Sequence, residues 1–131
     1  MRLVAMLLLA AGLAPAAYAS KDAAPPAQVQ AGEAVYARCL ACHSLAYDRT
    51  GPRHCGLFGR LAGSVPGFPY SEAMRRSKIV WNEQTLDRFL ATPGKSVPGT
   101  TMGYAGIEDK QERSALIAYL RQANDSAACR R

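Results

Sequence analysis

The residues best suited to chemistry in this sequence form one pentapeptide, Cys39-Leu40-Ala41-Cys42-His43. In the spacing C-x-x-C-H, two thiols can each add to a vinyl group of one haem, and the adjacent histidine can bind the iron as an axial ligand. The two cysteines could instead form a thioredoxin-like redox pair or half of a zinc site. A redox pair needs a βαβ context, which is missing, and zinc needs a second ligand pair of similar spacing, whereas Cys55 and Cys129 stand alone. The motif therefore favours haem.

A second axial ligand should come from a distant part of the chain. Of the four methionines, Met1 and Met6 lie in the first nineteen residues, so the choice falls between Met74 and Met102. Met74 belongs to a helical stretch, where a methionine is ordinarily a partly buried packing residue. Met102 lies in the segment Pro98–Gly106, whose glycines allow the backbone to approach a flat ligand closely. This favours Met102, with a role as a core methionine as the alternative.

The first nineteen residues have the pattern of a secretory signal peptide. Arg2 precedes an apolar run, Leu3–Ala14, and the segment ends in the small-residue sequence Ala17-Tyr18-Ala19. The run is too short to span a bilayer of ~30 Å, although an uncleaved anchor is the alternative. We predict cleavage after Ala19 and export, with the bacterial periplasm as the expected location.

Composition limits the remaining chain to one domain and narrows its partners. Removing 19 of 131 residues leaves 112, enough for a single core but not for two. These carry 15 basic and 10 acidic residues, a formal charge of +5 before any cofactor. Such a surface suits acidic proteins or anionic membranes. Nucleic acid is disfavoured because no basic run is interleaved with aromatic residues.

Hydrophobic periodicity and turn residues predict an all-α chain with long loops. Residues 20–30 are predicted to be a flexible leader, residues 31–124 the folded domain and residues 125–131 a tail. A first helix is expected within Gly32–Leu40, and the glycine-rich stretch Ser44–Phe68 is expected to form loops. A loop of that length in a small domain suggests that a cofactor supplies part of the core.

Three further helices are expected in the second half of the chain. Tyr70–Ser77 can form a short one, and Asn82 can cap a second that runs to about Leu90. Pro93 should end the helical pattern and lead into the loop Val97–Gly106. Asp109 followed by Glu112 resembles a capping box at the start of a last helix that ends near Ala123.

Residues 32–123 resemble the class I cytochromes c, of the mitochondrial and bacterial cytochrome c2 type, over nearly the whole mature length. The motifs that carry the resemblance occur in the family's order: Cys39–His43, Thr50–Pro52, Gly56–Arg60, Gly67–Tyr70, Ile79–Trp81, Pro98–Met102 and Leu116–Leu120. The resemblance implies a fold of about four to five helices wrapped around one haem c, which is attached through Cys39 and Cys42.

The resemblance also implies roles for individual residues. His43 and Met102 match the axial pair, and the carbonyl of Pro52 matches the acceptor for the second ring nitrogen of His43. Four other residues match positions around the haem propionates: Tyr70 and Trp81 bind the buried one, Arg60 lies near its charge, and Thr100 contacts the other. Gly32, Tyr36, Leu116 and Tyr119 match the contact between the first and last helices.

Several positions depart from the family pattern. Phe89 stands where relatives usually carry a tyrosine whose hydroxyl approaches the methionine sulfur. The cations around the exposed haem edge are reduced to Arg38, Lys95 and Lys110, with Glu108 and Asp109 among them.

Cys55 and Cys129 are not part of the haem pattern. Export into an oxidising compartment favours their pairing, and the family topology brings the tail toward the loop that contains Cys55. We therefore predict a Cys55–Cys129 disulfide, and we expect the neighbouring His54 to be a surface residue and not a ligand.

The family resemblance implies a monomeric, non-enzymatic carrier of single electrons between redox proteins, a membrane oxidoreductase or an oxidase among them. The alternative is an electron-entry, gas-binding or peroxidase-like haem protein with a labile methionine ligand. Absence of a second C-x-x-C-H and of a candidate general base beside Met102 favours the carrier.

Overall fold

The computed structural model describes residues 24–130, and these form five α-helices and one 3-10 turn. The elements in chain order are α1 (Pro26–Tyr36), the 3-10 turn η1 (Ala37–Cys39), α2 (Glu72–Arg76), α3 (Glu83–Ala91), α4 (Pro93–Ser96) and α5 (Lys110–Asn124). Within this part of the chain the extended structure is limited to an isolated bridge between Leu61 and Val80. The all-α prediction is therefore confirmed.

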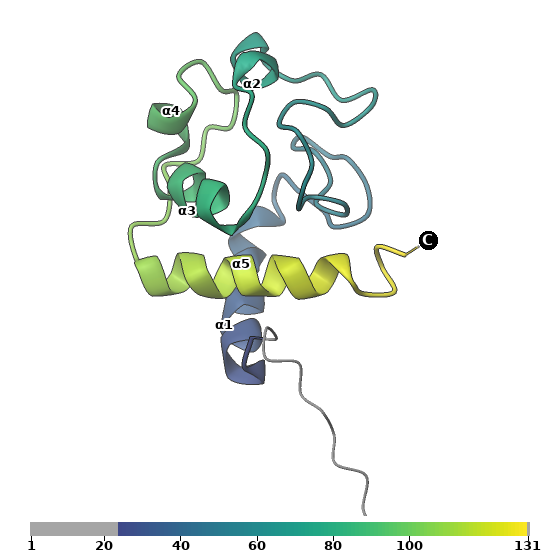
Figure 1. Cartoon of the computed structure of the whole chain (residues 1–131), viewed down its shortest axis with the longest axis vertical. Helices are drawn as coiled ribbons and strands as arrows, with labels where there is room; N and C mark the ends of the chain where they lie inside the picture. Colours follow the sequence, from purple (N-terminus) through teal and green to yellow (C-terminus); the bar gives the residue numbers. More distant parts are fainter. Residues whose placement is uncertain (1–23, 131) are drawn as a thin grey trace, which may run out of the picture.

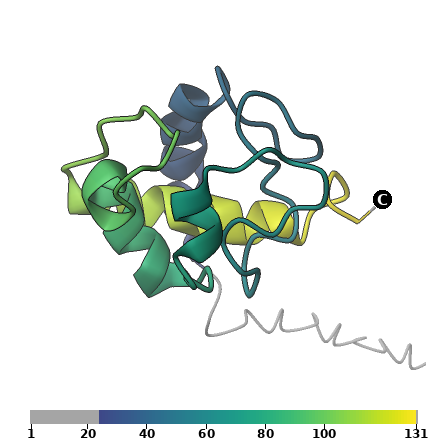
Figure 2. The ribbon, with the colours of Figure 1, turned by 90° about the horizontal axis from the view of Figure 1, so that it is seen from above.

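Helices α1 and α5 cross in contact with each other, and the loops and short helices lie on one side of this pair (Figures 1 and 2). Gly32 permits the close approach, because a Cβ atom there would overlap the backbone of Ala115 and lie 2.8 Å from Cβ of Tyr119. The rings of Tyr36 and Tyr119 pack beside the crossing, with centroids 5.2 Å apart. The predicted contact between the first and last helices is thus confirmed.

Helix α1 begins earlier than predicted, so residues 26–30 belong to the folded domain and not to a leader. Pro26 occupies a first-turn position, where its missing N–H is not needed and its fixed φ suits a helix. The amides of Gln28 and Val29 donate to the carbonyl of Pro25 at 2.9 and 3.2 Å, and the Gln28 side chain donates to Ser114 of α5 at 3.0 Å. Packing against α5 therefore extends the helix. The predicted signal peptide and residues 20–23 lie outside the described residues.

The N-terminus of α3 is capped as predicted. Asn82 Oδ1 accepts a hydrogen bond from the amide of Thr85, and Thr85 Oγ1 accepts one from the amide of Asn82, both at 2.8 Å. Ser71 similarly caps α2 by accepting from the amide of Met74 at 3.2 Å. The cap at Asn82 begins α3 at the expected residue, whereas α2 begins at Glu72, two residues later than predicted.

The capping box predicted for α5 is only half formed. Asp109 Oδ1 accepts from the amide of Glu112 at 2.8 Å, but the carboxylate of Glu112 binds the guanidinium of Arg38 instead of the amide of Asp109. The crossing of α1 and α5 brings Arg38 close to Glu112. The bidentate bond between their charged groups is stronger than a bond from Glu112 to the amide of Asp109.

Pro93 ends α3 as predicted but also starts α4, which the sequence analysis did not include. Thr92 lies outside the helical region, with φ −154° and ψ 81°, and its carbonyl accepts from the amides of Lys95 and Ser96 at 3.1 and 3.0 Å. The same property of proline that ends one helix suits the first turn of the next.

The loop between α4 and α5 is fastened at its C-terminal end. The amide of Ile107 donates to the carbonyl of Leu90 at 2.9 Å, and a guanidinium nitrogen of the buried Arg113 donates to the carbonyls of Ile107 and Glu108, both at 2.8 Å. This fixes the loop that carries Met102 against α3 and α5. None of the helices between residues 24 and 130 has the length and apolar character needed to cross a membrane.

Candidate functional site

A cavity of about 450 Å³ lies above the crossing of α1 and α5, between the loops of the first half of the chain and the loop of residues 97–107. All nine residues predicted to bind the cofactor line it: Cys39, Cys42, His43, Pro52, Arg60, Tyr70, Trp81, Thr100 and Met102. Several of the apolar core side chains complete its wall, among them Leu86, Phe89, Leu90, Leu116 and Leu120. The fold therefore gathers the predicted residues around one cavity.

His43 is almost fully buried, and its ring is held by its Nδ1 atom. Nδ1 lies 2.7 Å from the carbonyl oxygen of Pro52, so it donates its proton there and leaves the lone pair on Nε2. Burial lowers the pKa of His43, and the bond to Pro52 partly opposes that shift. The neutral imidazole that results is the form that binds a metal ion.

Cys39 and Cys42 carry free thiols at the wall that also bears His43. Cys39 ends the 3-10 turn η1, and its carbonyl accepts from the amides of Cys42 and His43 at 3.1 and 2.8 Å. This tight turn brings both thiols and the imidazole to the same cavity. Burial raises the pKa of the Cys39 thiol.

Two methionines line the cavity. Met102 is half-buried in the loop, where its amide donates to Oγ1 of Thr100 at 3.2 Å. Met74 is 8% exposed and lies in α2 among the core side chains. The structure therefore agrees with the packing role predicted for Met74, and it places both sulfur-bearing residues within reach of the cavity.

Arg60 and Trp81 join the two segments that form another wall. The guanidinium of Arg60 donates to the carbonyls of Cys55 and Arg53, both at 2.9 Å. The amide of Trp81 donates to the carbonyl of Arg60 at 3.0 Å, and the Trp81 side chain is 7% exposed. Burial raises the pKa of Tyr70, which keeps its proton. Donors from Arg60 and Tyr70 are thus available beside the cavity.

The predicted surface position of His54 is wrong. We expected a surface histidine, but its ring stacks on His43 with centroids 4.4 Å apart and planes 19° apart. Its Nδ1 lies 3.1 Å from the hydroxyl of Tyr36, and burial lowers the pKa of His54 to about 3. The position directly before Cys55 gave no sign of this burial, because folding of the loop turns the ring inward.

Cys55 and Cys129 lie side by side, with Cα atoms 5.1 Å apart and their sulfur atoms joined. The turns that follow α5 bring Cys129 to the loop after Pro52, as Figure 1 shows for the C-terminal end of the chain. Asn124, the last residue of α5, adds a bond from the amide of Leu57 at 3.0 Å. The formation of the disulfide in the mature protein stays a prediction.

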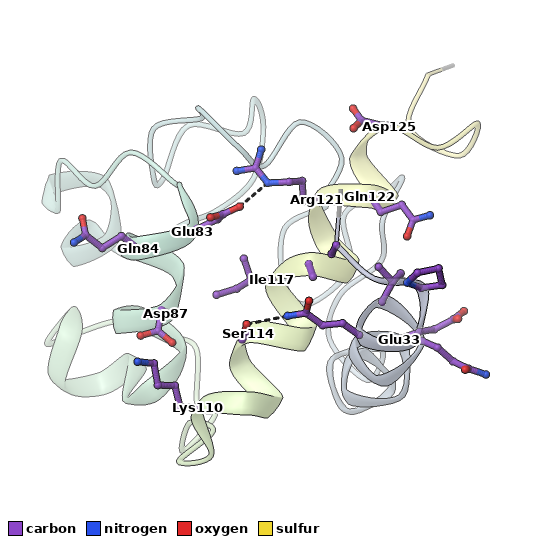
Figure 3. Close-up of a pocket in the computed structure, with 16 residues that line it drawn as sticks. Glu33, Glu83, Gln84, Asp87, Lys110, Ser114, Ile117, Arg121, Gln122 and Asp125 are labelled. Atoms are coloured by element: carbon purple, nitrogen blue, oxygen red, sulfur yellow. Dashed lines mark hydrogen bonds and ion pairs between the residues drawn. The ribbon is translucent and has the colours of Figure 1, made fainter. Parts of the chain in front are cut away.

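Of the three cations expected around the cofactor edge, only Arg38 lines the cavity. Its guanidinium is paired with Glu112. Lys110 instead lines a second, larger cleft of about 1060 Å³ between α1, α3 and α5, shown in Figure 3. There Arg121 is paired with Glu83 at 2.8 Å, and the lining includes no cysteine, histidine or methionine. The larger cleft therefore lacks the cysteine, histidine and methionine donors of a haem c site.

The donor set of the smaller cavity fits a haem. It offers two free thiols, an imidazole nitrogen with its lone pair available and a thioether sulfur, which are the groups that bind this cofactor in proteins. Its volume lies in the range of cofactor sites. Within residues 24–130, no buried side-chain nitrogen or oxygen lacks a hydrogen-bond partner. The buried polar side chains therefore do not require a polar ligand in the cavity.

Comparison with known proteins gives one consistent result. The family model for cytochrome c matches residues 29–124. Cytochrome c2 of Blastochloris viridis is 43% identical over 122 residues, which cover 91% of this chain and 90% of that protein. Cytochrome c of Sesamum indicum is 42% identical over 109 residues, covering 80% and 98%. The solved structure of cytochrome cH from Methylobacterium extorquens matches with a TM-score of 0.70 and 38% identity, covering 72% of this chain and 97% of that one.

Proposed function

Because the chain belongs to the cytochrome c family, we propose that it is an exported electron carrier in which His43 and Met102 are the axial ligands of one haem. As an electron-transfer haem protein of this family, it carries one haem c, held through Cys39 and Cys42. The observation that carries the proposed ligation is the single cavity that His43 and Met102 both line. When bound, the haem supplies an iron that changes reversibly between two oxidation states one electron apart.

The chain's own residues would tune and protect that change. Pro52 keeps the proton of His43 on Nδ1, which directs the lone pair of Nε2 to the iron and raises the basicity of the ligand. Met102 would provide a soft thioether sulfur, which favours the reduced state. The buried apolar wall, with Leu86, Phe89 and Leu116, excludes water and disfavours the additional positive charge of the oxidised state.

Polar side chains at the cavity would bind the haem carboxylates. We assign Tyr70 and Trp81 to the buried propionate, Arg60 to the charge nearby and Thr100 to the second propionate. The support is that all four line the cavity and that Arg60 is half-buried, where a carboxylate is a favourable neighbour. Arg60 already donates to two backbone carbonyls, so it would act by its charge and by its remaining donors.

Residues 26–124, from the start of α1 to the end of α5, would then form the working domain of a monomer, with residues 125–131 as its tail. The signal pattern of residues 1–19 supports export to the periplasm. We propose redox proteins as donor and acceptor, with no substrate converted and no nucleic acid bound. A formal charge of +5 suits a partner with an acidic surface.

Potentiometric titration of the purified holoprotein tests this function. We expect reversible oxidation and reduction with a Nernst slope of about 59 mV per tenfold change in the ratio of the oxidised to the reduced form, as one electron requires. The ferric protein should show the far-red absorbance band of methionine ligation, and the ferrous protein should not bind added carbon monoxide. An absent band together with rapid carbon monoxide binding would favour the gas-binding or peroxidase-like alternative. N-terminal sequencing should begin at Ser20.

A further inference from the structure

The ring of His43 is contacted from more than one direction. Its Nδ1 donates to the carbonyl of Pro52 at 2.7 Å. The backbone of Gly51 lies against the ring, because a Cβ atom on Gly51 would come within 2.6 Å of Nε2 and 2.7 Å of Nδ1. The imidazole of His54 stacks on the same ring, with centroids 4.4 Å apart. The backbone of Gly51, the carbonyl of Pro52 and the ring of His54 therefore surround His43.

His54 is itself held firmly. Its Nδ1 lies 3.1 Å from the hydroxyl of Tyr36 on α1. Its amide donates to the carbonyls of Ser44 and Leu45 at 3.0 and 3.1 Å, and its carbonyl accepts from Nδ2 of Asn124 on α5 at 3.2 Å. These bonds tie the residue to α1, to α5 and to the segment directly after His43. The stacked ring is thus fixed by contacts that do not involve His43.

We propose that His54 is a positioning residue, which fixes the plane of the His43 imidazole through the stacked ring. The inference rests on the axial role proposed for His43. A single hydrogen bond at Nδ1 leaves an imidazole free to rock about that bond, because the terminal torsion of histidine has broad preferences. A flat ring packed against its face removes this freedom. An imidazole serves here because it combines a flat face with a nitrogen that reaches Tyr36.

The competing explanation is that His54 only fills space in the core. It predicts that replacement lowers stability and leaves the environment of His43 as it was. A positioning role predicts instead that the electronic structure of the ferric haem and the Nδ1 proton of His43 both change. These properties can be measured on holoprotein without any assay of electron transfer.

The test compares holoprotein variants by paramagnetic resonance of the ferric state and by hydrogen exchange at Nδ1 of His43. In His54→Ala we expect altered g values and Nδ1–H exchange about tenfold faster, since the bond to Pro52 weakens by about that factor. His54→Phe keeps a stacked ring but loses the bond to Tyr36, and Tyr36→Phe leaves the His54 ring in place without that bond. Both variants should change both measurements in the direction of His54→Ala, but by a smaller amount.

Tyr119→Phe is the matched control, because the Tyr119 ring packs on Tyr36, whereas the ring pairs and the side-chain bond of His54 are with Tyr36 and His43. It should leave both measurements unchanged. Parental g values and exchange in His54→Ala would overturn the proposal. If His54→Ala does not give folded holoprotein, unchanged values in Tyr36→Phe overturn it instead. Failure of the underlying function is separate: parent protein without hyperfine-shifted ring protons of His43 would refute the axial assignment itself.

Discussion

Arg113 on α5 donates from Nε to a carboxylate oxygen of Asp87 on α3 at 2.8 Å, and the Arg113 side chain is 10% exposed. A second guanidinium nitrogen, Nη1, donates to the carbonyls of both Ile107 and Glu108, which end the loop that carries Met102. One guanidinium thus joins α5, α3 and this loop. Lysine cannot reproduce this because it lacks the planar fork of donors.

Arg113→Lys should therefore lower the free energy of unfolding by about 2 kcal/mol, the cost of losing bonds to a partly buried charged group. The matched control is Arg76→Lys, because Arg76 pairs with Glu72 on the exposed surface and should change stability by less than about 0.5 kcal/mol. Urea unfolding followed by circular dichroism measures both. Equal effects of the two substitutions would show that Arg113 has no special anchoring role.

Met102→Ala should leave the haem covalently attached but open the iron to added cyanide or carbon monoxide. The reason is that Met102 is the proposed sixth ligand, whereas Met74, on α2, packs in the hydrophobic core. Absorbance titration with each ligand is the measurement. Met74→Ala is the control, for which we expect a loss of stability of about 2 to 5 kcal/mol from the cavity and no ligand binding. The reverse outcome would transfer the ligand role to Met74.

Phe89→Tyr should raise the midpoint potential. Phe89 is 6% exposed and lines the cavity with Met102. A tyrosine hydroxyl there can donate to the methionine sulfur and withdraw electron density from ferric iron. A neutral hydrogen bond of about 1 kcal/mol corresponds to a rise of about 40 mV for one electron. Potentiometric titration decides this, and an unchanged midpoint with the ligands intact would contradict it.

The Cys55–Cys129 disulfide should be present in the mature protein. In the chain-entropy model, a bridge across a sequence separation of 74 residues stabilises the fold by roughly 4 kcal/mol. Mass spectrometry of unreduced tryptic peptides should find the two segments linked, and the double change to serine should lower stability by roughly that amount. Free, alkylatable thiols at both positions would refute the bridge and leave Cys129 as a thiol of the tail.

Stability should fall at alkaline pH because of Tyr36. Burial raises the pKa of Tyr36 above its usual value of 10.0, so the unfolded chain loses this proton before the folded chain does. The contribution to stability is complete below pH 10 and is lost as the pH rises toward the folded-state pKa. Each pH unit in that range costs up to about 1.4 kcal/mol.

Tyr36→Phe removes the ionisable hydroxyl, so this part of the pH dependence should disappear. Urea unfolding of parent and variant between pH 9 and 12 provides the comparison. Burial also raises the pKa of Tyr70 and of Tyr119. These two residues should therefore leave a smaller decline of stability with pH in both proteins. Parallel stability curves for parent and variant above pH 10 would contradict the prediction.

Features that depend on neighbouring residues could be predicted from the order of the amino acids. The haem motif is contiguous, and the caps at Asn82 and Asp109 act on amides three residues later. Such bonds form wherever the local chain becomes helical, so their residue types can be interpreted without knowledge of the fold. The family motifs also predicted the nine cofactor-binding residues, which are far apart in sequence but line one cavity.

Features that depend on distant partners could not be predicted in this way, because folding brings those partners together. Residues 26–30 are helical because they pack on α5, and Gln28 binds Ser114, 86 residues away. Glu112 leaves its cap for Arg38, and His54 turns inward to Tyr36 and His43. In each case a local preference is weak beside burial or a charged hydrogen bond, and these arise only when the crossing of α1 and α5 brings the partners together.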